Sequence, residues 1–138
     1  MADYGTIKEA LATQLNTSTV VEVVYANPPE VPFTPCAIII PATGTAVEYG
    51  DAMQRGLLQM FFTVTFLVQR FDLDNNVVRL DPLIYGDNSV DQLLAANRTL
   101  SGAVSYARVV SCGDIGNIGY GDDIYLGVDF ELEVMVEP

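Results

Sequence analysis

The sequence predicts an α+β fold: a mainly antiparallel β-sheet packed with a few short helices in a single domain over residues 1–138. The final segment, 126–136, alternates between apolar and other side chains, which is the period of a strand with one buried face. Residues 53–70 repeat this alternation. Between these segments, apolar residues recur every three or four positions, as on one face of a helix. The length of 138 residues suits one domain.

The N-terminal segment predicts a helix over residues 7–15. Ile7, Leu11 and Leu15 recur at four-residue spacing and mark one apolar face. Thr6 has Glu9 three positions later, which is the pattern of a capping box, and Asn16 is expected to end the helix.

Three strands are expected in the rest of the first half. β-branched residues predict a strand over 19–25, and a proline-rich connection follows it. The short apolar run 36–40 predicts a strand that is buried on both faces. Residues 42–51, with their glycines, threonines and acids, are expected to form a loop or hairpin tip, and the length of this stretch makes it a candidate functional loop. Residues 53–70 then form the longest strand.

Two short helices and two strands are expected in the second half. Residues 77–84 share one apolar face, although Pro82 should delay or kink that helix. A second helix should begin after Ser89, with Gln92 as its capping partner, and stop near Gly102. Residues 107–111 predict a strand. The glycine-rich stretch 112–123 is expected to be a flexible hairpin connection to the last strand.

Composition limits the functional classes. The chain carries six basic and eighteen acidic residues, so its net charge is −12, and it contains no histidine. A histidine-based triad and a zinc site with imidazole ligands are therefore excluded. The scarcity of Lys and Arg argues against groove binding to nucleic acid. The N-terminal residues suggest no signal peptide, and no apolar run is long enough for a membrane-spanning helix, so we expect a soluble cytosolic domain.

No complete catalytic or ligand-binding motif is found. Residues 72–76 resemble the opening of a calcium loop, but Val77 replaces the required glycine and Leu83 the required glutamate, which favours a plain turn. The glycines of 112–123 lack the spacing and the lysine of a phosphate loop. Cys112 is expected to be a buried free thiol, like Cys36. We expect no enzyme activity, no metal and no cofactor.

The last strand places three carboxylates on one face, those of Asp129, Glu131 and Glu133. A solvated face is ordinary for an antiparallel sheet, and arginine partners such as Arg98 or Arg108 would neutralise the row. Unpaired like charges in a row cost stability, so a surface that repels a negatively charged partner is the alternative reading.

Several short segments, spread over nearly the whole chain, resemble segments of the tail-terminator (tail-completion) proteins of long-tailed double-stranded-DNA phages, most closely those of actinobacteriophages. The N-terminal amphipathic helix is one shared feature. The others are the proline-rich entry into an apolar strand, the long strand, the helical region and the last strand, at residues 31–38, 59–70, 80–86, 89–94, 98–104 and 125–132.

The resemblance implies a structural role. Such proteins form a ring, usually six-fold, on the head-proximal end of the tail tube, where they stop tube polymerisation and present the surface that docks on the head connector. The implied partners are other copies of the chain, the tail-tube protein and the connector, and DNA only passes through the lumen. The implied location is the virion tail, with assembly in the host cytoplasm.

From the resemblance we expect Asp129, Glu131 and Glu133 to line the lumen. Contacts with neighbouring subunits or with the tail tube are expected from the two long loops and the start of the long strand, at Thr43, Glu48, Asp51, Arg55, Asp114 and Asp122. The alternatives are a head-tail connector or tail-tube subunit, or, in a different class, a small acidic monomeric binding domain or a carboxylate-based hydrolase.

Overall fold

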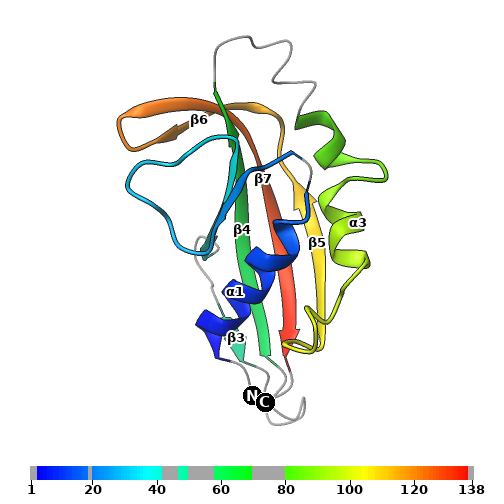
Figure 1. The fold of residues 1–138 in the computed structure, drawn as a ribbon. Helices are drawn as coiled ribbons and strands as arrows, with labels where there is room; N and C mark the ends of the chain where they lie inside the picture. Colours follow the sequence, from blue (N-terminus) through cyan, green and yellow to red (C-terminus); the bar gives the residue numbers. More distant parts are fainter. Residues whose placement is uncertain (1–2, 19, 42–46, 50–57, 70–79, 137–138) are drawn as a thin grey trace.

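A computed structural model describes residues 3–18, 20–41, 47–49, 58–69 and 80–136. Within these residues the fold is α+β, as predicted, with helices on one face of a mixed, mostly antiparallel sheet (Figure 1). The helices are α1 (Tyr4–Leu15) and α3 (Val90–Ala95), with a further helical turn at 80–84. The strands are β1 (Val23–Tyr25), β2 (Cys36–Pro41), β3 (Val47–Tyr49), β4 (Leu58–Val68), β5 (Tyr106–Cys112), β6 (Gly116–Tyr120) and β7 (Asp123–Val136).

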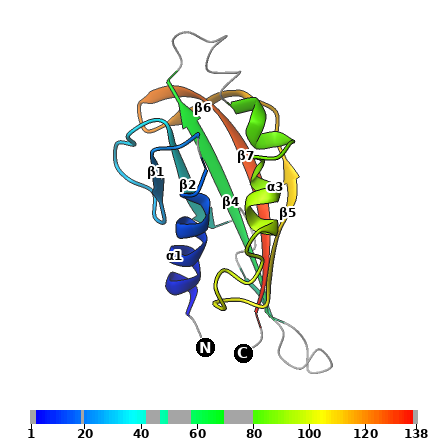
Figure 2. The same ribbon diagram turned by 45° about the vertical axis from the view of Figure 1, so that its right-hand side comes forward.

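The strands form one sheet with the path β1-β2-β4-β7-β5, in which β3 also pairs with β4 and β6 with β7. Among the strands that the structure describes, only β1 and β2 pair in parallel. The last strand is central, as its apolar alternation predicts, because β4 pairs with it along one side over Leu58–Val68 while β5 and β6 pair along the other. The edges of the main path are therefore β1 and β5 (Figure 2).

The main core lies between the helices and the sheet. The alternate residues of β7 that were predicted to point inward are all buried there, with Phe130 edge-on to Phe66 at a centroid distance of 5.4 Å. From α1, Ile7, Leu11 and Leu15 are fully buried against this layer, so the predicted helix face is confirmed.

A second, smaller core covers part of the opposite face. Cys36 and Ile38 of β2 contribute to it, whereas Ala37 and Ile39 belong to the main core, so β2 is buried on both faces as predicted. The hairpin of β6 and β7 folds over this end of the sheet and supplies Tyr125 (Figure 1). The opposite end of this face carries no helix among the described residues.

Two predicted helix boundaries are wrong. The first helix is capped by Asp3 and not by Thr6: the Asp3 carboxylate accepts a hydrogen bond from the Thr6 amide at 2.7 Å, and Thr6 lies within the first turn. The second helix begins after Ser89 as predicted, but it ends at Ala95. Beyond it the chain makes tight turns in which the Asn97 side chain accepts from the Ser101 amide, a local bond that competes with helix formation.

The two predicted loops also need correction. The stretch 112–123 forms a hairpin with the last strand as predicted, but it is more regular than expected, because residues 116–120 form β6. In the stretch 42–51, residues 47–49 form β3, and the rest lies outside the described residues. The calcium-like residues 72–76 and most of the helix expected at 77–84 also lie outside them. The strand predicted at 19–25 is regular only at 23–25.

Candidate functional site

The candidate site is the part of the sheet that faces away from the helices and is not covered by the hairpin. Alternate residues of β4 and β7 point to this face because side chains of a strand alternate between its two sides. Its polar members come from both strands and from β5, and they are Gln59, Thr63, Thr65, Arg108, Asp129, Glu131 and Glu133. We call this set the polar sheet face.

Two of the three predicted carboxylates are exposed and are held by threonines on the neighbouring strand. Thr65 Oγ1 donates to Asp129 Oδ1 at 2.7 Å. Thr63 Oγ1 lies 3.2 Å from Glu131 Oε1 and 3.3 Å from Oε2. Each threonine stands directly opposite its carboxylate in the register of β4 and β7. These bonds fix the position of two negative charges on a rigid strand without neutralising them.

The third carboxylate lies on the same face of β7 as predicted, but its environment differs from that of the other two. Glu133 is buried and pairs with Arg108 on β5, whose Nη2 lies 3.0 Å from Glu133 Oε2. Gln59 Nε2 donates to the other carboxylate oxygen at 3.3 Å. Among the described residues, the predicted alternative of an arginine partner at Arg108 therefore holds for Glu133. Arg98 instead donates to the Ala107 carbonyl oxygen and lies over the Tyr106 ring.

The cysteines are poorly suited to nucleophilic chemistry. Both are free thiols; Cys36 is buried as predicted, but Cys112 is only half-buried. Burial raises the pKa of the Cys36 thiol to about 11. Burial, followed by the charges of Asp114 and Asp129, also raises the pKa of Cys112. Since the thiolate is the reactive form, neither residue is activated at neutral pH.

The predicted contact residues are not gathered at one place. Glu48 lies in β3, opposite Gln59 in the register, at one end of the sheet. Asp122 is exposed at the turn between β6 and β7 at the other end, and Asp114 is exposed between β5 and β6. Thr43, Asp51 and Arg55 lie outside the described residues.

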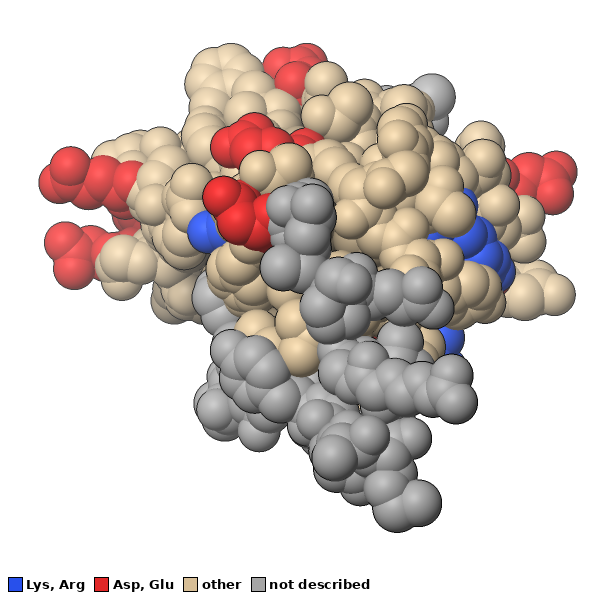
Figure 3. All heavy atoms as spheres, turned by 90° about the horizontal axis from the view of Figure 1, so that it is seen from below, with Lys and Arg blue, Asp and Glu red and all other residues tan. Residues whose placement is uncertain are grey.

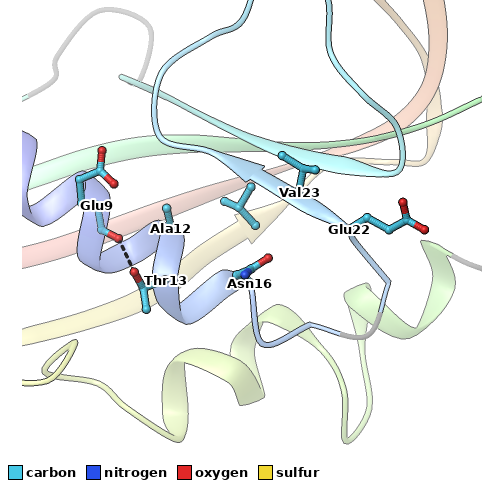
Figure 4. A pocket seen from close by; sticks show the side chains of 7 residues that line it. Glu9, Ala12, Thr13, Asn16, Glu22 and Val23 are labelled. Carbon is cyan, nitrogen blue, oxygen red and sulfur yellow. Dashed lines mark hydrogen bonds between the residues drawn. The ribbon is translucent and has the colours of Figure 1, made fainter.

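Two surface hollows lie in the described part of the chain. One of about 330 Å³ lies between α1 and β1, and Figure 4 shows Glu9, Thr13, Asn16 and Glu22 around it. In this view the Thr13 hydroxyl bonds to the Glu9 carbonyl oxygen of its own helix. A smaller hollow of about 220 Å³ lies beside Tyr85 and Ser89. Neither brings together a base, a nucleophile and a donor set.

Acidic groups predominate on the surface as well as in the sequence. Figure 3, an end view, shows acidic side chains at several separate places and few basic ones. Among the described residues, no group of three or more His, Cys, Asp or Glu side chains is arranged to hold a metal ion. In the same residues, no helix is long and apolar enough to cross a membrane. No protein-family model and no curated protein sequence matches the chain.

Sequence reasoning missed the partners of the carboxylates. Thr63 and Thr65 are separated from Glu131 and Asp129 by more than sixty residues, so their pairing depends on the register of two distant strands. The available signal was that both segments alternate, which fits two paired strands, but alternation alone does not give their relative register.

Proposed function

We propose that this protein is a structural virion protein that caps the head-proximal end of a phage tail tube as a ring, ends tube polymerisation and forms the docking surface for the head connector. The order of the sequence segments that resemble those of tail terminators supports this proposal. The observation that carries it beyond the resemblance is the polar sheet face, where Asp129 and Glu131 are exposed and fixed by threonines.

Such a face suits a passage for DNA. Duplex DNA carries about one negative charge per 1.7 Å of its axis, and a basic wall would hold it by contacts with its phosphates. Carboxylates that are hydrogen-bonded to threonine hydroxyls repel phosphate and do not bind it. At physiological salt their field reaches about 8 Å, so the polar sheet face acts in this way only if it lines the opening closely.

The length of the tails that assemble in the absence of the protein, and their joining to heads, test the proposal. We expect phage particles deprived of it to make tails of uncontrolled length that fail to join heads, and the purified protein, added during assembly, to restore a uniform length. Electron microscopy of negatively stained tails measures this. A complete absence of tails would indicate a tube subunit, and tails of normal length that fail to join heads would indicate a connector; either result contradicts the proposal.

A further inference from the structure

Exposed apolar side chains gather at the two opposite edges of the sheet. Beyond β1, in the proline-rich segment 26–35, Val31 is 74% exposed and Phe33 is 61% exposed. On β5, Tyr106 is 39% exposed and Val110 is 49% exposed. Figures 1 and 2 both show the segment after β1 on one side of the sheet and β5 on the other. We call residues 22–35 the loop flank, and β5 with Arg98 the β5 flank.

The loop flank is held in a fixed conformation. The Phe33 amide donates to the hydroxyl oxygen of Tyr25 at 3.0 Å. The Tyr120 hydroxyl of the hairpin donates to the carbonyl oxygen of Pro29. Because two tyrosines and several prolines restrict the backbone of the loop, binding of a partner to Val31 and Phe33 costs less backbone conformational freedom than binding to an unrestrained loop.

The β5 flank is a sheet edge with an aromatic and basic surface. The guanidinium of Arg98 lies 5.0 Å from the centroid of the Tyr106 ring. Arg108 is half-exposed on the same strand, although it pairs with Glu133. The register shifts between Val109 and Ser111, and Val110 lies at this irregularity. Such a bulge hinders continuous strand pairing at an edge, so a partner is expected to meet this flank through side chains.

The charges of the two flanks are opposite. Glu22 and Glu30 are exposed on the loop flank. Two of the three basic residues in the described part of the chain, Arg98 and Arg108, lie on the β5 flank, and Lys8 is the third. Because each chain carries a net charge of −12, two copies repel each other unless these opposite patches meet.

We propose that the loop flank of one copy binds the β5 flank of a second copy, head to tail. A contact between two different patches repeats from copy to copy and closes into a ring when the rotation permits. Pairing of identical flanks brings acid to acid or arginine to arginine and is disfavoured. The inference rests on the proposed function for the ring, and it names the surfaces that build it.

The test uses two variants that each damage one flank. The loop variant carries Val31→Ser and Phe33→Ser, and the β5 variant carries Val110→Asp; all three positions are exposed, so folding is preserved. We expect the wild type to form a complex of several chains by light scattering, and each variant alone to have the mass of one chain. Tyr85→Ser removes an aromatic ring that is 91% exposed and belongs to neither flank, and it should leave the complex intact.

Mixing the two variants discriminates between modes of association. The loop variant retains an intact β5 flank and the β5 variant an intact loop flank, so the mixture should give a complex of two chains that grows no further. Glu30→Arg tests the charge contribution without altering apolar contacts, and it should weaken association at least about tenfold at low salt. A wild type of single-chain mass, a variant that assembles like the wild type, or a mixture without a two-chain species overturns the inference.

Tail length separates this inference from the proposed function. If both variants assemble normally while tails made without the protein are uncontrolled in length, the flanks are wrongly assigned and the proposed function stands. If the variants behave as expected but tails form normally without the protein, the interface stands and the proposed function fails.

Discussion

Arg108 and Glu133 stand directly opposite each other on β5 and β7, and Arg108 Nη2 lies 3.0 Å from Glu133 Oε2. The side chain of Glu133 is almost buried, whereas that of Arg108 is about half-exposed. The pair removes one carboxylate from the row of three on β7 and joins the edge strand β5 to the centre of the sheet. Asp129 and Glu131 are therefore the carboxylates that the polar sheet face presents to solvent.

Replacing Arg108 with methionine should lower the free energy of unfolding by about 1–2 kcal/mol, because the Glu133 carboxylate then stays buried with only Gln59 as its partner. The loss stays below that for a fully buried pair, since solvent screens the half-exposed guanidinium. Urea denaturation measures it. Adding Glu133→Gln to Arg108→Met removes the unpaired charge and should restore most of the stability; a double variant no more stable than the single one contradicts this account.

Gly127 is expected to tolerate no side chain. A Cβ atom there would overlap the carbonyl oxygen of Phe66 and lie 2.9 Å from Ile118 Cδ1. The Phe66 carbonyl belongs to the backbone of a central strand and cannot move aside. Gly127→Ala should therefore lower the free energy of unfolding by about 1–3 kcal/mol. It should also loosen the β6–β7 hairpin, which hydrogen exchange of β6 amides would report.

Gly119 in the same hairpin is the matched control for Gly127. A Cβ atom at Gly119 would meet nothing within 4 Å, and its backbone is not in the left-handed region. Gly119→Ala should therefore leave stability unchanged or raise it by up to about 1 kcal/mol through the unfolded chain. Equal losses for the two alanine variants would show that the close approach at Gly127 is not the cause.

The long elements of this fold could be predicted from periodicity alone. The alternation of β7 is uninterrupted from Leu126 to Val136, and a single face of the strand carries six buried apolar residues at alternate positions, so both the strand and its central place follow. The short β6 was missed because glycines at 116 and 119 mask its alternation, in which Ile118 and Tyr120 face the smaller core. The first helix cap was misplaced because Asp3 and Thr6 both suit a cap and only the backbone decides between them.

The polar sheet face could be predicted only in part. The carboxylates on one side of β7 are visible in the sequence, but their different environments depend on neighbours from other strands. Glu133 meets Arg108 twenty-five positions earlier in the chain, and Asp129 meets Thr65 sixty-four positions earlier. No local pattern encodes such pairs, because the relative register of strands is set by the packing of the whole core.

Truncating Phe130 tests the central place of β7. Its side chain is 1% exposed and edge-on to Phe66, so Phe130→Ala should cost about 3–5 kcal/mol of unfolding free energy, the usual range for a core aromatic. Ile124→Ala, at a position of the same strand that is mostly exposed, should change stability by less than about 0.5 kcal/mol. Denaturant titration of both variants decides the matter, and a loss below about 1 kcal/mol for Phe130→Ala would refute the assignment.

Stability should fall in alkaline solution because of Cys36. Its pKa is raised by burial from an ordinary value of 9.0 to about 11, so the folded chain holds the thiol proton more tightly than the unfolded chain does. The free energy of unfolding is therefore unaffected by this group below about pH 9 and decreases as pH rises from there to about 11. The two-unit difference corresponds to at most about 3 kcal/mol.

Cys36→Ala should flatten this alkaline decline while lowering stability at every pH through the small cavity it leaves. Part of the decline should remain, because burial also raises the pKa of Tyr120 and of Tyr125 above the ordinary value of 10.0. Urea midpoints measured between pH 8 and 11 give the slope for each protein. Identical slopes for the variant and the wild type would show that the Cys36 thiol does not titrate in this way.

Reversing the two exposed charges of the polar sheet face tests whether it lines the passage for DNA. Asp129→Lys with Glu131→Lys should leave the fold intact, because both side chains are exposed on the surface of β7 and neither belongs to the hydrophobic core. We expect particles to assemble and to eject DNA more slowly, with the defect diminishing as salt rises, since contacts between lysine and phosphate weaken with salt. Asp87→Lys with Asp91→Lys makes the same charge change at exposed positions at the start of α3 and should leave ejection unchanged. Equal delays for both double variants, or none for the first, would place the polar sheet face away from the DNA.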